Sequence, residues 1–167
     1  MIAVIPGTFR LATAIIVLCV TACGFRLQGI GTLPVEMAVT WIQWPANVSP
    51  DLQRQLPRSL ASSGITIATT PEDATAVLEI VENRYGERVL SVSATNIPEE
   101  LESYHSVTFE LRAGEALLFP RETITLTRDY TFDERAVLAK YQEGEIIAKA
   151  LVRDVVQQIR RRLAVLE

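Results

Sequence analysis

Alternating apolar and polar residues predict β-strands in several parts of this chain. In residues 35–44 the apolar positions fall loosely on one parity, and Pro45 ends the run because proline cannot donate to a sheet ladder. In residues 101–112 the odd positions from 107 onward are apolar and the even ones polar, which is typical of a half-buried antiparallel strand. The last predicted strand, residues 122–132, has apolar residues on one face and, on the other, Thr123, Thr125 and Thr127.

The middle of the chain is equally rich in β-forming residues, but its pattern leaves two interpretations open. Residues 76–85 and 87–95 form either one long strand or two strands with a turn or bulge between them. Residues 96–100 predict a loop. Gly114 predicts a turn, after which residues 117–119 can continue a hairpin.

A different periodicity predicts the first helix. Ser49 can cap its N-terminus, and Pro50 suits the first helical position. Three leucines then follow at a spacing of four, which gives one apolar stripe, and Gly64 is the expected end. Residues 65–67 predict a short extended connection.

The second helix is predicted over residues 143–163, where apolar residues follow the 3.6-residue period and three arginines fall in the last turn. The fold class that follows is α/β (α+β), a two-layer sandwich in the order β-α-β-β-β-α. We expect a four-stranded mixed sheet with both helices packed on one face, in a single domain over residues 35–167.

The N-terminal segment is of another kind. Its apolar run, residues 11–20, follows one cation, Arg10, and is about 10 residues long, whereas a membrane span needs roughly 20. It therefore predicts a secretory signal peptide. Cys23 comes directly after small Ala22 and resembles the acylated cysteine of a bacterial lipobox. Residues 1–22 would then be removed, and 23–34 would be a lipidated tether; the alternative is an ordinary signal peptide with Cys23 as a free thiol.

Composition narrows the possible functions. The formal net charge is −4, and such a mildly acidic chain is not expected to bind nucleic acid nonspecifically. The two cysteines both lie within the first 23 residues, and His105 is the only histidine, so we expect no metal site. Neither a nucleophile elbow nor a phosphate-binding loop occurs. We therefore expect no enzyme and no cofactor apart from covalent lipid on Cys23.

Three basic residues surround the connection from the last strand to the last helix: Arg128, Arg135 and Lys140. Because Lys140 follows a short apolar stretch, these cations could meet an amphiphile that carries phosphate groups. Alternatively, they pair with the carboxylates nearby in the sequence, which are Asp129, Asp133, Glu134 and Glu143. Spacing alone favours the pairing.

Two motifs resemble a known family, the lipopolysaccharide (LPS)-assembly lipoprotein LptE family. The first is Cys-Gly-Phe-Arg-Leu-Gln-Gly at residues 23–29, directly after the lipobox. The second is Leu-Thr-Arg-Asp-Tyr-Thr-Phe-Asp at residues 126–133, with Val-Leu-Ala-Lys at 137–140 leading into the terminal helix. The middle of the chain matches only in its pattern of strands.

The resemblance implies a non-enzymatic, lipid-anchored protein on the periplasmic face of the outer membrane. Its partner would be an LptD-type β-barrel, which it plugs and helps to assemble, and its ligand would be LPS. Lys140 matches the family's basic residue implicated in LPS contact. Gly24, rather than aspartate, follows the cysteine and favours outer-membrane delivery. A periplasm-facing lipoprotein that serves another envelope or secretion complex is the alternative, and an enzyme that uses His105 is a further one.

Overall fold

The computed structural model describes residues 33–131 and 137–165, and the side chains of 137–141 are left out of the description. The predicted signal peptide, Cys23, nearly all of the predicted tether and Arg135 lie outside the described residues. In chain order the elements are η1 (Val35–Ala38), β1 (Val39–Gln43), α2 (Pro50–Ala61), β2 (Thr66–Ile67), η2 (Pro71–Asp73), β3 (Ala76–Val92), β4 (Pro98–Ala113), β5 (Ala116–Thr131) and α3 (Val137–Leu163).

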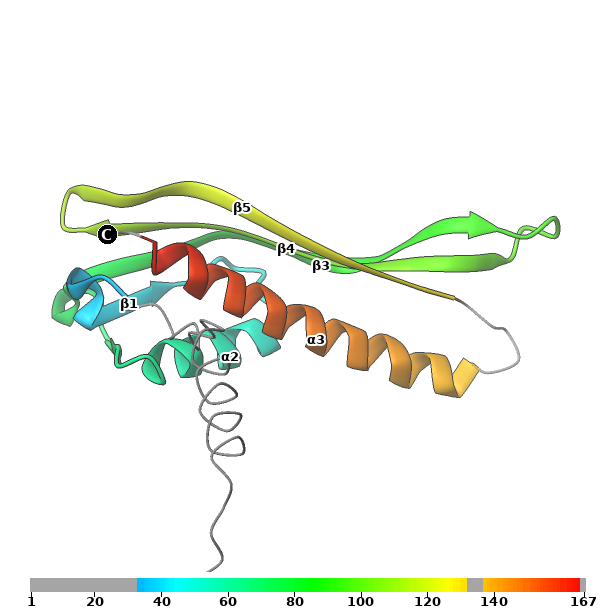
Figure 1. Ribbon diagram of the computed structural model, residues 1–167, viewed down its shortest axis with the longest axis horizontal. Helices are drawn as coiled ribbons and strands as arrows, with labels where there is room; N and C mark the ends of the chain where they lie inside the picture. Colours follow the sequence, from blue (N-terminus) through cyan, green and yellow to red (C-terminus); the bar gives the residue numbers. More distant parts are fainter. Residues whose placement is uncertain (1–32, 132–136, 166–167) are drawn as a thin grey trace, which may run out of the picture. The chain divides into compact units, whose positions relative to one another are not determined.

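The domain has two layers, as predicted: a mixed sheet with α2 and α3 on one face (Figure 1). The sheet, however, has five strands in the order β2-β1-β3-β4-β5, so the prediction of four was wrong. The extra strand is β2, which pairs in parallel with β1 through Thr66 and Ile67. A strand of two residues has no periodicity, and the sequence pattern could not distinguish it from an extended connection.

The middle of the chain is one long strand, β3, which settles the alternative left open above. Its pairing with β4 shifts register between Ile80 and Glu82 and again around Val89 to Val92. A bulge adds one residue and moves the following side chains to the opposite parity. The buried residues are therefore even-numbered up to Ile80, but Asn83 is the next one buried.

Three other boundaries differ from the predictions. Residues 35–38 form a 3-10 helix instead of the start of β1, and β4 begins at Pro98, inside the predicted loop. The hairpin does continue through residues 117–119, because β5 begins at Ala116. Helix α3 begins at Val137, six residues before the predicted start, which places Lys140 in its first turn and not in a loop.

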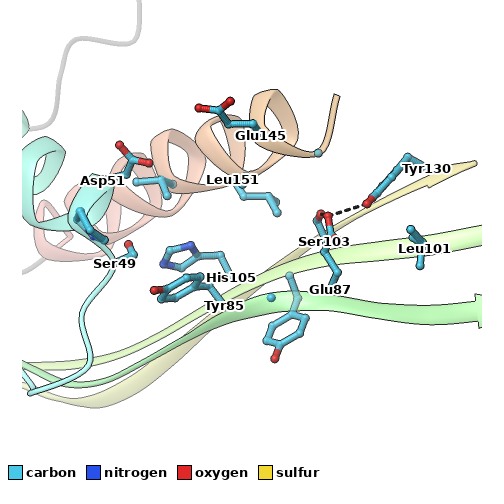
Figure 2. A pocket seen from close by; sticks show the side chains of 16 residues that line it. Ser49, Asp51, Tyr85, Glu87, Leu101, Ser103, His105, Tyr130, Glu145 and Leu151 are labelled. Atoms are coloured by element: carbon cyan, nitrogen blue, oxygen red, sulfur yellow. Dashed lines mark hydrogen bonds between the residues drawn. The ribbon is translucent and has the colours of Figure 1, made fainter. Parts of the chain in front are cut away.

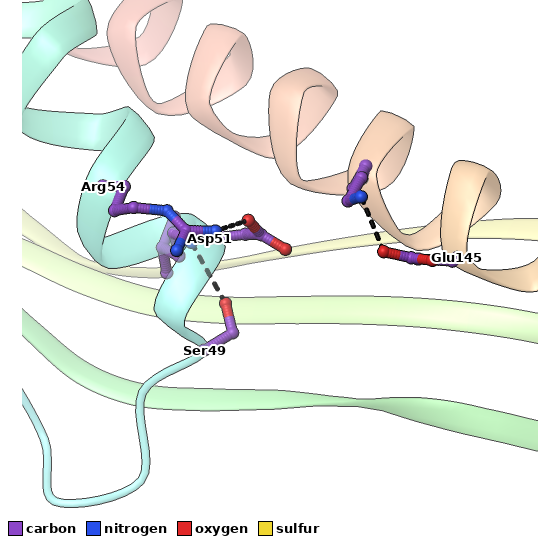
Figure 3. Close-up of polar contacts among 6 residues, drawn as sticks. Ser49, Asp51, Arg54 and Glu145 are labelled. Carbon is purple, nitrogen blue, oxygen red and sulfur yellow. Dashed lines mark hydrogen bonds and ion pairs between the residues drawn. The ribbon is translucent and has the colours of Figure 1, made fainter.

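Helix α2 begins as the sequence predicts. The Ser49 hydroxyl accepts a hydrogen bond of 3.2 Å from the Leu52 amide, and Asp51 in the first turn pairs with Arg54 (Figure 3). The leucine stripe of α2 is fully buried, and the helix ends before Gly64, whose φ of +90° is in the left-handed region. These features fix the point at which α2 meets the sheet.

The core lies between the two helices and the sheet half that is nearest to α2. It contains residues from η1, from β3, β4 and β5 and from both α-helices. The largest of these residues are Met37, Leu52, Leu56, Leu60, Leu78, Ile80, Phe109, Leu111, Ile159 and Leu163. The far halves of β3 and β4 extend beyond α2 (Figure 1). Only α3 accompanies the sheet toward that end.

Candidate interaction surface

On the side of the sheet that points away from both helices, β4 and β5 carry mainly hydroxyl and charged side chains, and we call this part of the sheet surface the outer face. Side chains of neighbouring strands lie opposite one another on this face, and several of those on β4 and β5 carry hydroxyl groups. Ser106 lies opposite Thr125 with a hydrogen bond of 2.9 Å between the hydroxyls, and Thr108 lies opposite Thr123 at 2.8 Å. The predicted threonine face therefore exists, and β4 extends it.

Charged residues flank this hydroxyl ladder on both sides. Glu110, whose side chain is 5% exposed, accepts hydrogen bonds from Arg112 at 2.9 Å and from Arg121 at 3.1 Å. The hydrogen bond from Arg112, with a smaller contribution from Arg121, holds the pKa of Glu110 below its usual value against the opposing effect of burial. Toward the other end, Arg88 pairs with Glu102.

The pairing within the outer face has a consequence for binding. Each buried carboxylate on it has a guanidinium partner, so the surface presents matched charges and hydroxyls instead of a field of one sign. Such a surface can hydrogen-bond to a polar partner over a wide area. It has neither the excess positive charge of a nucleic-acid site nor the apolar character of a buried oligomer interface.

The structure does not bring the three predicted cationic residues into one described cluster. Arg128 lies on β5, on the side of the sheet that faces α3, and its guanidinium is 3.3 Å from the Asp154 carboxylate of that helix. Asp154 is distant in sequence and is not one of the neighbouring carboxylates that the sequence suggested as partners of Arg128. Lys140 lies in the first turn of α3, and Arg135 lies outside the described residues.

His105 is the residue on which an enzyme hypothesis would depend, and it is 3% exposed. The Ser49 amide donates to Asn83 Oδ1 at 2.8 Å, which orients the Asn83 amide so that Nδ2 donates to His105 Nε2, also at 2.8 Å. The Tyr85 ring stacks on the imidazole at a centroid distance of 5.7 Å (Figure 2). Burial lowers the pKa of His105 to about 4, so the ring is neutral at neutral pH.

These contacts give His105 a structural role: with Asn83, it ties the N-terminus of α2 to the middle of the sheet. His105 shares the parity of Val107 and Phe109 along β4 and is buried with them, whereas the sequence gave no sign of Asn83, which the bulge turns inward. Among the described residues, no three of His, Cys, Asp and Glu lie together in a way that could hold a metal ion. Over the same part of the chain, no helix is both long and apolar enough to cross a membrane.

Comparison with known proteins finds the same fold in solved lipoprotein structures. Lipoprotein B from Nitrosomonas europaea is 29% identical, with a TM-score of 0.71 over 84% of this chain and 90% of that one. A minor lipoprotein from Acinetobacter baumannii (23% identity, TM-score 0.65, 78% and 93% coverage) and rare lipoprotein B from Shewanella oneidensis (22%, 0.63, 75% and 93%) share the fold. No curated protein sequence matches the chain.

These neighbours and the architecture define a fold class, in which two helices cover one face of a mixed sheet. The family can be stated as well. The family model for LptE, lipopolysaccharide assembly, matches residues 36–163. The chain belongs to this family, so the resemblance to it is confirmed; of the two motifs, only the second, at residues 126–140, lies within the matched residues.

The buried, neutral His105 predicts a specific dependence of stability on pH. Its pKa in the folded state is below the unfolded value of 6.5, so the unfolded chain binds more protons between pH 6.5 and about 4. The contribution of His105 to the free energy of unfolding is therefore fully present above pH 6.5 and decreases as the pH falls toward 4. We expect the free energy of unfolding in urea to decrease by roughly 2 kcal/mol from about pH 7 to about pH 5 through this group.

The matched variant is His105→Gln, which keeps an acceptor for Asn83 but does not titrate. His105 is the only histidine, so this variant should show a nearly constant free energy of unfolding over the same pH range. If the variant keeps the full slope of the wild type, other groups cause the pH dependence and His105 is not neutral in the folded state.

Proposed function

We propose that this protein is an outer-membrane lipoprotein, facing the periplasm, that plugs an LptD-type β-barrel and assists its assembly for delivery of LPS to the outer leaflet. Membership of the LptE family over residues 36–163 supports a role in LPS assembly. The plug role is our extension, and the observation that carries it is the outer face, with its hydroxyl ladder between Ser106–Thr125 and Thr108–Thr123.

The physical argument concerns the environment inside a barrel. Interior-facing residues of outer-membrane barrels are polar, so a plug must offer hydrogen-bonding groups without a large unpaired charge. The outer face does so along two strands of 16 residues each. The carboxylates Glu102 and Glu110 are paired by arginines, so the face would not carry an unpaired carboxylate into a confined space, which costs more than a matched ion pair.

A second candidate function is an interaction module for another envelope or secretion complex. The fold is compatible with it, since one fold hosts many partners. Affinity capture of the tagged protein from outer membranes distinguishes the two. We expect an LptD-type barrel to be the main captured protein, and recovery of a different envelope protein in its place would support the alternative.

A substitution on the outer face tests the plug role directly. Thr125 is exposed on the edge strand β5, and Thr125→Trp keeps a good strand-forming residue while adding bulk to the ladder. We expect at least about a fivefold loss of captured barrel, the equivalent of about 1 kcal/mol. Thr125→Ser is the matched control, because it keeps the hydroxyl group without adding bulk and should be captured normally. Normal capture of a folded Thr125→Trp protein would remove this face from the contact.

For LPS itself we propose Lys140 as the main contact, with Arg128 and Arg135 as secondary ones. A lysine that pairs with phosphate through a charge-assisted hydrogen bond contributes about 1.5–3 kcal/mol, so Lys140→Asp should weaken LPS binding at least about tenfold. Because Lys140 lies in the first turn of α3, an aspartate there complements the helix dipole, and the fold should be retained.

The control for this variant is Arg153→Asp, which makes the same charge change at an exposed position of α3. LPS binding can be measured by titration, and folding by circular dichroism. If both variants weaken binding equally, the effect is one of net charge and Lys140 is not a specific contact.

We further propose that Cys23 is acylated and becomes the N-terminus, with residues 1–22 removed. Intact-mass spectrometry should show the wild type shortened by 22 residues and carrying lipid. Cys23→Ser removes the thiol that would be acylated, and we expect a protein with no attached lipid. A lipidated Cys23→Ser protein would disprove the assignment.

A further inference from the structure

A cavity of about 560 Å³ lies between α3 and the sheet, beyond the point where α2 begins (Figure 2). Its floor is formed by the α3-facing residues of β3 and β4, including Tyr85 and Leu101, and its roof by Ala148, Leu151 and Val152 of α3. Leu151 and Val152 are 2% and 3% exposed and give the roof an apolar inner surface. This volume is in the range of small-molecule sites, about 300–1,000 Å³.

The far end of the cavity is closed by three residues on three elements. Tyr130 of β5 donates a hydrogen bond of 2.6 Å to Glu87 Oε1 of β3, and Ser103 donates to the same oxygen at 3.3 Å (Figure 2). Gly144 of α3 lies against them: a Cβ atom there would be 3.1 Å from Glu87 Oε1 and 3.6 Å from the Tyr130 hydroxyl. A glycine inside a helix costs about 1 kcal/mol relative to alanine, and this close approach accounts for its presence.

The near end is closed by the N-terminus of α2, at Ser49, Pro50 and Asp51. The helix cap and the Ser49–Asn83–His105 hydrogen bonds hold this end in place. The cavity is thus bounded at both ends by polar contacts, while its middle is mainly apolar. A space that is apolar in the middle and polar at both ends fits an extended hydrocarbon chain better than a compact polar ligand.

The charges of the residues that line the cavity restrict the kind of head group that the ligand can have. Three of its residues are acidic, Asp51, Glu87 and Glu145, and among the described residues no lysine or arginine lines it. Asp51 pairs with Arg54 (Figure 3) and Glu145 pairs with Lys149, but neither of these two cations lines the cavity. An anionic head group would therefore meet carboxylates, and none of the described lining residues offers it a cation, which raises the cost of burying it.

We infer that this cavity binds a single hydrocarbon chain, with an uncharged or cationic group next to the carboxylates and any phosphate kept outside. This goes beyond the proposed function, because a chain can bind here with or without a barrel partner. The chain can come from LPS, from a phospholipid or from the lipid on Cys23 of the protein itself. The common chemistry is that of an acyl chain attached through an ester or amide.

The first test uses the full chain carrying Cys23→Ser, so that no attached lipid competes, and three probes with the same ten-carbon chain: decanol, decylammonium and decanoate. Binding is followed by NMR through the methyl groups of Leu101 and Leu151, with Leu56 in the core as an internal control. We expect saturable shifts at the two cavity residues with decanol and decylammonium. Decanoate should bind at least about fivefold more weakly, because its charge is repelled by the lining carboxylates.

Ala148→Phe fills the cavity from α3 and should abolish the shifts, whereas Gln157→Phe, at an exposed position of the same helix, should leave them unchanged. No saturable shift with decanol in the folded wild type would overturn the inference. Equal affinity for decanoate would overturn the assigned head-group chemistry. Retention of binding by a folded Ala148→Phe protein would place the chain elsewhere. Capture of the barrel partner is a separate measurement, so its failure cannot be confused with any of these results.

A second test identifies the source of the chain in the membrane. A photoreactive amino acid at position 148 of the full chain should yield either an adduct with the added mass of LPS or of a phospholipid, or an adduct within one chain to the protein's own lipid, which adds no mass and is detected by peptide mapping. Loss of the adduct in the Cys23→Ser background would assign it to the last of these. An adduct formed only with protein would overturn the inference, and the same amino acid at position 157 is the matched control.

Discussion

The constraint on which the rest of the structure depends is the length of the antiparallel strands. β3, β4 and β5 have 16 or 17 residues each, whereas strands in globular proteins usually have about 5 or 6. Two helices cover one face of this sheet, and α2, with 12 residues, covers only one half of it. The outer face must therefore be stable without a second layer, and the far half must be supported by α3 alone.

Pairs of polar side chains stabilise both the outer face and the far half of the sheet. The outer face satisfies its side chains across the strands, through the hydroxyl ladder and through arginines placed over Glu102 and Glu110. The far half is held to α3 by contacts at a few points, including Arg128 with Asp154 and the close approach of Gly144 to Glu87. Between those points the helix and the sheet are not in full contact, and the cavity is the space that remains.

The sequence predicted those parts of the fold whose periodicity is local. The leucine stripe and cap of α2, the alternation in β4 and the threonine face of β5 all follow from neighbouring residues. The errors have one physical origin: they concern positions that depend on contacts distant in the chain. β2 exists only because Thr66 and Ile67 pair with β1, and the bulge near Glu82 is stable only because β4 fixes the register.

The candidate site shows the same limit. Glycine is a poor helix former, yet Gly144 lies inside α3, next to the predicted start of this helix at residue 143. The structure explains why a glycine occupies this position, because Glu87 and Tyr130 lie against it. Both residues are distant from Gly144 in the sequence. Arg128 likewise has its partner, Asp154, 26 residues further along the chain.

The family could be inferred from two terminal motifs, yet the cavity is assembled from side chains in the central strands, where the sequence resembled the family only in its pattern. The parts that identify this protein and the parts that would determine its ligand are therefore different segments of the chain.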